Sequence, residues 1–156
     1  MTDTQTTAGM SAIDVYVGLS TDGSSWTDLS GQTLSVEVSG GERQTGSALT
    51  FTGDTPILKR GKRGVITVTI RGIYTETTSK FWNMAKTAYE SATASLYARW
   101  SPGGGDSGDY GYTTSAGICK NCVYPNADVN SADPILCECV IDCATVTEAA
   151  IGTAGW

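Results

Sequence analysis

The stretch of sequence that decides the fold is GVITVTIRGIYTETTSKFWNMAKTAYESATASLYARW, which runs from Gly64 to Trp100. Residues 65–71 alternate apolar and polar side chains, and this period of two predicts a β-strand. Residues 78–92 repeat apolar side chains at helical spacing, which predicts one amphipathic helix that packs a single face against a sheet. Residues 95–100 alternate again and predict a second strand directly after the helix.

Alternation in the rest of the sequence predicts further strands. Residues 13–19 and 34–38 each alternate apolar and polar positions, so we expect two half-buried strands early in the chain. Residues 117–124 and 135–146 flank the turn-rich PNADVNSADP and are typical of a long hairpin. Gly72 predicts a bulge before the helix, and the segment TETTS offers Thr and Ser residues as helix caps. The fold class is therefore mainly β, a sandwich or barrel-like domain with one flanking helix.

The chain length of 156 residues is typical of one domain. Residues 1–11 lack periodicity and predict a flexible N-terminal arm. Residues 12–147 form the expected β-domain, and residues 148–156 form a C-terminal tail. Within the domain, residues 40–64 show no firm pattern and predict a long loop, which in a compact domain is usually functional or disordered.

Composition excludes several classes of function. The chain contains no His, which excludes serine–histidine triads, cysteine–histidine dyads and zinc sites that use histidine. No apolar run is long enough to cross a bilayer, and the start MTDTQTTAGMSA lacks the pattern of a secretory signal. We therefore expect a protein that is made in the cytoplasm, does not insert in a membrane, and has neither enzymatic activity nor a cofactor.

Charge is unevenly distributed along the sequence. The formal net charge of −6 divides into six acidic and no basic residues in 1–42, ten basic and five acidic residues in 43–120, and five acidic and no basic residues in 121–156. One interpretation is that these charges simply keep loops solvated. The alternative is a basic and an acidic region that meet on neighbouring copies, as in heterologous assembly. The acidic balance argues against tight binding of nucleic acid.

A basic cluster is the candidate contact site in the segment 40–64. By default such a cluster lies at a solvated hairpin tip, and the functional alternative is contact with an acidic surface of a partner subunit or ring. The candidate residues are Arg43, Lys59, Arg60, Lys62 and Arg63.

Five cysteines fall in two groups near the end of the chain, Cys119, Cys122, Cys137, Cys139 and Cys143. CxxC followed by CxC is compatible with zinc, but strand geometry points Cys119 and Cys122 to opposite faces. We favour core packing, in which Ile118, Cys122, Ile135, Cys137, Cys139, Ile141 and Cys143 share one face. A disulfide from Cys122 to Cys137 or Cys139 is a further alternative, and the redox state is open.

The Gly-rich segment SPGGGDSGDYGYTTSAG resembles no phosphate-binding motif, since it lacks the G-K-[ST] ending and a strand follows it. Asp106, Asp109 and Tyr110 form a loose cluster in this segment. A small enzyme with a Cys or Asp nucleophile would need such a cluster, but the sequence supplies neither a base nor an oxyanion site for it.

Four segments carry a resemblance to a known family: VITVTIRGIYTETT, FWNMAKTAYESA, LYARWSPGGG and YPNADVNSADPILCECV. Their order and spacing are similar to those of the major tail tube protein of long-tailed, siphovirus-type bacteriophages across residues 12–147. The resemblance implies a tail-tube β-fold in which six copies pair strands into a ring. Rings then stack into a tube through which the genome leaves the capsid.

The resemblance also implies the partners and location of the protein. It would associate with itself and with tape-measure and tail-terminator proteins, and DNA would pass through it without specific binding. It would reside in the virion tail after assembly in the host cytoplasm, with residues 40–64 between stacked rings. Two alternatives stay open: a β-sandwich decoration or recognition module of a virion or cell surface, and the tube protein of a contractile injection system.

Overall fold

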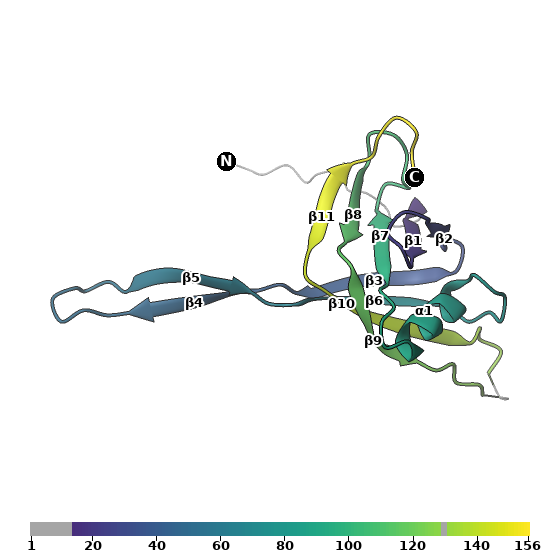
Figure 1. The fold of residues 1–156 in the computed structure, drawn as a ribbon, viewed down its shortest axis with the longest axis horizontal. Helices are drawn as coiled ribbons and strands as arrows, with labels where there is room; N and C mark the ends of the chain where they lie inside the picture. Colours follow the sequence, from purple (N-terminus) through teal and green to yellow (C-terminus); the bar gives the residue numbers. More distant parts are fainter. Residues whose placement is uncertain (1–13, 129–130) are drawn as a thin grey trace, which may run out of the picture.

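The structure, a computed structural model, describes residues 14–128 and 131–156 (Figure 1). The expected N-terminal arm of residues 1–11 lies outside the described residues. The described chain folds into two packed antiparallel sheets, one helix and a two-stranded hairpin that projects from them. This arrangement confirms the predicted fold class, mainly β with one flanking helix.

The first sheet has five strands, in the spatial order β11 (Val146–Ala150), β8 (Tyr110–Thr114), β7 (Tyr97–Ser101), β1 (Tyr16–Ser20) and β2 (Thr27–Asp28). Every residue of β1 is buried, whereas its sequence predicts a half-buried strand. The second face of β1 is covered by the Arg99 side chain, whose guanidinium lies over the rings of Tyr16, Trp26 and Trp156 at 5.0, 4.6 and 4.8 Å.

The second sheet has four strands, in the order β3 (Thr33–Gly40), β6 (Ile66–Ile73), β10 (Leu136–Cys143) and β9 (Gly117–Val123). The predicted hairpin is confirmed, since β9 and β10 pair antiparallel. An isolated bridge between Leu96 and Gly117 joins the two sheets at a corner. The core lies between them and contains Leu19, Val68 and Ile70, all of which are fully buried. In Figure 1, β3 and β6 run across the direction of β7 and β8.

Helix α1 (Phe81–Glu90) packs on the core face of the four-stranded sheet, beside the five-stranded one. It buries Phe81, Trp82, Ala85 and Ala88, which confirms most of the predicted apolar stripe. Ala92, the last residue of the predicted stripe, lies beyond the helix and is exposed, as is the flanking Tyr89. The helix is shorter than the predicted 78–92. The expected Thr or Ser cap is wrong, because the N-cap is Lys80 and no side chain bonds there.

Gly72 is the position where the helix approaches the sheet. A Cβ atom at Gly72 would lie 3.0 Å from Cδ1 of Phe81 and 2.9 Å from the carbonyl oxygen of Gln32. The predicted bulge at Gly72 is misplaced: β6 pairs with β10 without interruption, and the register shift falls on β3, between Thr33 and Ser35. The absence of a side chain at Gly72 therefore lets the Phe81 ring pack directly on the β6 backbone.

We predict that Gly72→Ala lowers the free energy of unfolding by about 1–3 kcal/mol, because the added methyl group overpacks the helix–sheet contact. The matched control is Gly46→Ala, where a Cβ atom meets nothing within 4 Å. Denaturant unfolding of both variants measures the difference. Equal stability of the two variants would show that the helix does not depend on this close approach.

The segment 40–64, predicted to be a loop, forms a hairpin of β4 (Arg43–Ala48) and β5 (Ile57–Arg63). We call it the hairpin arm. It continues from the ends of β3 and β6 and projects away from the body of the protein (Figure 1). At about 3.3 Å per residue, the ten residues from Glu42 to Phe51 reach roughly 30 Å.

Residues 148–156, predicted to be a tail, are packed in the described structure. Strand β11 runs to Ala150 and pairs with β8. Ile151 is buried, and the Trp156 ring meets the ring of Tyr16 edge-on at 5.5 Å. These contacts pack the segment against the five-stranded sheet.

Candidate assembly surfaces

The cysteines belong to the core rather than to a functional site. All five are free and buried. A bulge in β9 explains why Cys119 shares the core face with Cys122, against the expectation from simple alternation: the register with β10 shifts between Val140 and Ile141. For the same reason Ile118, expected in the core, is 71% exposed.

The chemistry of these thiols fits their burial. Burial raises the pKa of Cys122 to about 12 and that of Cys137 to about 11, so both thiols stay neutral near pH 7. The sulfur atoms of Cys119 and Cys139 lie 3.4 Å apart, whereas the alternative disulfide would join Cys122 to Cys137 or Cys139. Within residues 14–128 and 131–156, no group of three or more Cys, Asp or Glu is placed to hold a metal ion.

The loose cluster of Asp106, Asp109 and Tyr110 lies in the turn before β8 and at its start. The Asp109 carboxylate accepts a hydrogen bond from the backbone N–H of Asp106 at 3.1 Å. The Asp109 backbone N–H donates to the Asp106 carbonyl at 3.1 Å, and the Asp109 carbonyl accepts from the backbone N–H of Ile151 at 2.7 Å. These contacts give the cluster a structural role in closing the turn over the C-terminal segment.

The hairpin arm displays its side chains to solvent on both faces. All residues of β4 are exposed, and so are those of β5 except Gly61, which is half-buried. Cross-strand pairing places Thr45 opposite Arg60 and Ala48 opposite Ile57. Apart from Arg43 and Gln44, β4 carries small residues, so most of the large charged and apolar side chains of the two strands come from β5.

The basic cluster lies along the half of the arm nearest the sheets. Lys59 to Arg63 occupy β5, and Arg43 lies opposite Arg63 at the start of β4. A cluster at the hairpin tip, the default expectation, is therefore wrong. The structure brings all five predicted contact residues together on one stem, and the Arg43 guanidinium also donates a hydrogen bond to the Gly61 carbonyl at 3.4 Å.

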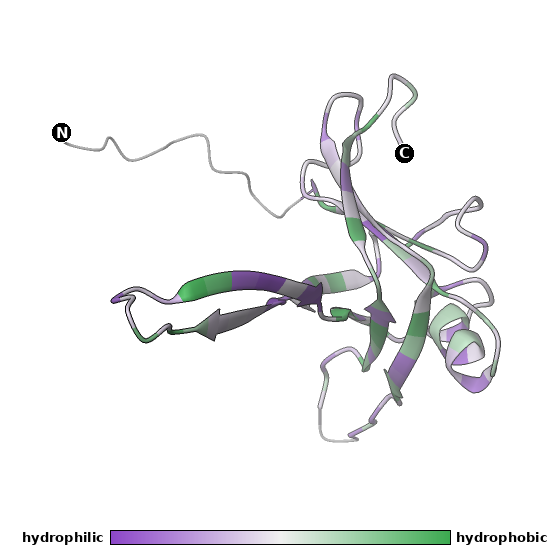
Figure 2. Cartoon of the chain, turned by 60° about the vertical axis from the view of Figure 1, so that its left-hand side comes forward, coloured by the Kyte–Doolittle hydropathy of each residue, from purple (hydrophilic) through white to green (hydrophobic). Residues whose placement is uncertain are grey.

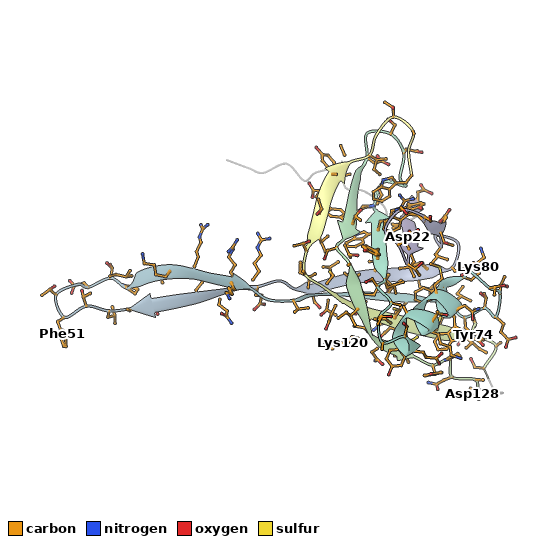
Figure 3. The ribbon with its side chains drawn as sticks, in the orientation of Figure 1. Asp22, Phe51, Tyr74, Lys80, Lys120 and Asp128 are labelled. Carbon is orange, nitrogen blue, oxygen red and sulfur yellow. The ribbon has the colours of Figure 1, made fainter. Side chains whose placement is uncertain are left out.

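The tip of the arm is apolar, which the sequence reading missed. Phe51 is labelled at the far end of the arm in Figure 3 and is fully exposed. Leu49, Ile57 and Leu58 are 72%, 50% and 70% exposed. Figure 2 shows the same order along β5, hydrophobic toward the tip and hydrophilic toward the sheets. An apolar patch held this far from the core is the signal of an interaction surface.

Strands β3 and β9 form the two edges of the four-stranded sheet. Edge strands present unpaired backbone groups and invite association unless they are covered. Apolar side chains are exposed on both edges, including Leu34 and Val38 on β3 and Ile118 and Val123 on β9. The edges are different in sequence, so edge-to-edge pairing between copies would be heterologous.

The face of the four-stranded sheet that points away from the core carries ion pairs, together with exposed Ile118 and Val123, which lie opposite Asp142 and Glu138. Arg71 lies between Glu138, at 2.6 Å, and Glu37, at 3.6 Å. Lys120 pairs with Asp142 at 3.2 Å, and the Asp142 carboxylate also accepts a hydrogen bond from the Thr67 hydroxyl at 2.7 Å. Both cations of this face are therefore held by carboxylates.

No model of a known protein family matches this chain, and no curated protein matches it. Solved structures do match in fold. A chain of the sheath–tube complex of an extracellular contractile injection system, PVC, in its extended state is similar with a TM-score of 0.64 and 13% identity, over 93% of this chain and 94% of the other. A chain of the PVC sheath/tube terminator in its extended state is similar with a TM-score of 0.68 and 13% identity, over 91% of this chain and 97% of the other. A chain of the tube-terminating cap of the anti-feeding prophage gives 0.64 and 12%, over 96% of each chain.

At this low identity the likeness shows the fold. The chain shares its fold, over nearly its whole length, with components of contractile injection systems. The predicted tail-tube fold is supported in this general form, while the likeness does not single out the tails of siphovirus-type phages. Among the described residues, no helix is long and apolar enough to cross a membrane.

Proposed function

We propose that this protein is a structural subunit that assembles through its sheet edges into rings, and that the rings stack into a tube. The observation that carries this proposal is the four-stranded sheet. One of its faces is covered by the second sheet and the helix, the other carries the ion pairs of Arg71 and Lys120, and both of its edge strands expose apolar residues.

Ring closure would use both edges. Strand β3 of one copy would pair with β9 of the next, which satisfies the exposed backbone groups of both. A heterologous contact closes into a ring when its rotation divides a full turn, and the resemblance to tail tubes implies six copies. The faces covered by the second sheet and the helix would then point outward, and the faces that carry the ion pairs would line a channel.

Stacking would use the hairpin arm. Because the arm continues β3 and β6, it leaves a ring along the direction of its wall strands and reaches toward the next ring. Its stem carries Arg43, Lys59, Arg60, Lys62 and Arg63 as the proposed contacts between subunits or rings. We expect these contacts to meet an acidic surface of the next copy, because residues 1–42 and 121–156 contain eleven acidic residues and no Lys or Arg.

Electron microscopy of the purified protein tests this proposal. We expect rings or open-ended tubes in negatively stained samples, at a protein concentration where sedimentation shows oligomers. A protein that stays monomeric across a range of concentration and salt would contradict the proposal. It would favour the alternative of a decoration or recognition module, which also needs neither a catalytic group nor a cofactor.

DNA passage is the proposed role of the channel in a phage tail. A channel wall must let the polymer slide, so it should lack free cations that hold phosphates. On the proposed wall, Glu37, Glu138 and Asp142 outnumber Arg71 and Lys120 and hold both of them. The formal charge of these five residues is −1 per copy.

We predict that Glu37→Gln combined with Asp142→Asn makes tubes retain DNA, because Lys120 loses its carboxylate partner, Arg71 loses one of its two, and the formal charge of the five residues changes from −1 to +1. The control is Glu76→Gln with Glu90→Gln, an equal change of charge away from this face. Tubes are assembled with short duplex DNA and pelleted. Equal DNA retention by the two variants would contradict the placement of this face in the channel.

The proposal includes the kind of particle to which the tube belongs, and two kinds are candidates. A virion tail of the siphovirus type would supply tape-measure and tail-terminator partners and a site of assembly in the host cytoplasm. The second candidate is the tube of a contractile injection system, which the likeness to PVC and anti-feeding prophage components favours. In that case a sheath would surround the outer face of the tube.

A further inference from the structure

We infer that the apolar tip of the hairpin arm docks in a groove at the opposite end of a second copy of this chain, and that this contact joins successive rings. The inference rests on the proposed function and names the surface that receives the arm. It differs from ring closure, because it uses neither the β3 edge nor the β9 edge for pairing.

The receiving surface, which we call the distal groove, is a cavity of about 560 Å³. Its apolar lining includes four exposed side chains from the ends of β9 and β10 and the segments beside them: Val123, Tyr124, Ile135 and Leu136. The floor is anchored, since the Tyr124 ring packs edge-on against the buried Trp82 of the helix at 5.2 Å. The apolar side chains of the groove thus stand on a floor that contacts the helix.

Charge favours the hairpin arm as its occupant. From Gly41 to Val65 the arm carries five basic and two acidic residues, a formal charge of +3. Among the charged residues that line the distal groove, Arg71 and Glu138 pair with each other at the border with the proposed channel wall. The formal charge of −2 therefore comes from Asp128 and Asp133. Both surfaces therefore combine apolar and charged residues, with opposite signs, so that contact between copies is attractive and contact between like ends is repulsive.

The fold places the two surfaces at opposite ends of the same strands. The β6–β10 ladder runs from the pair Ile66–Cys143 to the pair Ile73–Leu136. The arm continues from the Ile66 end, and the distal groove lies at the Leu136 end. Figure 3 shows this separation, with Phe51 at one end of the long axis and Asp128 at the other. A contact between opposite ends repeats in one direction, as stacking requires.

Two pairs of substitutions test the contact. The arm-blocked variant is Phe51→Asp with Leu58→Asp, and the groove-blocked variant is Ile135→Asp with Leu136→Asp. All four side chains are at least 37% exposed, so we expect both variants to fold, which thermal unfolding checks. The control is Tyr89→Asp on the helix, which changes an exposed ring (42%) outside both surfaces.

Each blocked variant alone should form no long tubes, and its self-association should weaken roughly tenfold or more, because charge replaces apolar contact. The control should assemble like the unmodified chain. Mixed in equal amounts, the two variants should associate again, because the intact arm of the groove-blocked variant can dock in the intact groove of the arm-blocked variant. The assembly should stop at two layers, because the remaining arm and the remaining groove of such a pair are both blocked. Electron microscopy counts the layers, and sedimentation measures the association.

Normal tubes from the groove-blocked variant alone would overturn the inference. So would a mixture that associates no better than either variant by itself. Failure of the proposed function is a different result: if the unmodified chain forms no rings, sedimentation still reports whether the mixed variants pair at concentrations where each alone is monomeric.

Discussion

The structure depends on one constraint, the unpaired edges of a sheet that is covered on a single face. Helix α1 and the five-stranded sheet bury the side of the four-stranded sheet that carries Val68, Ile70 and the cysteines. They leave β3 and β9 with apolar side chains in water. A monomer with such edges is an aggregation hazard, whereas a closed ring uses both edges and orders the association.

The same constraint gives the remaining surfaces their roles in the proposed assembly. Once the edges close a ring, the face with the paired charges would line the channel and the helix would stay outside. The hairpin arm and the distal groove are then left at the two rims, where rings meet. Solved components of contractile injection systems share this fold at 12–13% identity.

The fold was largely predictable from local patterns. Alternation in residues 65–71 and the stripe from Phe81 to Ala88 predicted the strand and the helix, because burial on one face dictates both periods. The prediction failed where tertiary contacts decide. Strand β4, with the sequence RQTGSA, has no alternation of apolar and polar residues that would predict a strand. Strand β11 lies at a sheet edge and pairs with the short strand β8, which lies inside a Gly-rich segment. The bulge in β9 reversed the sides of Ile118 and Cys119, because one extra residue changes the face.

The candidate site was predictable only in its charge. Arg43 and the run from Lys59 to Arg63 marked the segment, but the apolar tip around Phe51 needed the hairpin geometry. The central claim, association through the sheet edges, is tested most directly by amide hydrogen exchange of the protein before and after assembly. The account predicts that amides of β3 and β9 gain protection on assembly while those of the already paired β6 and β10 change little. Equal exchange of the β3 and β9 amides in the two states would contradict it.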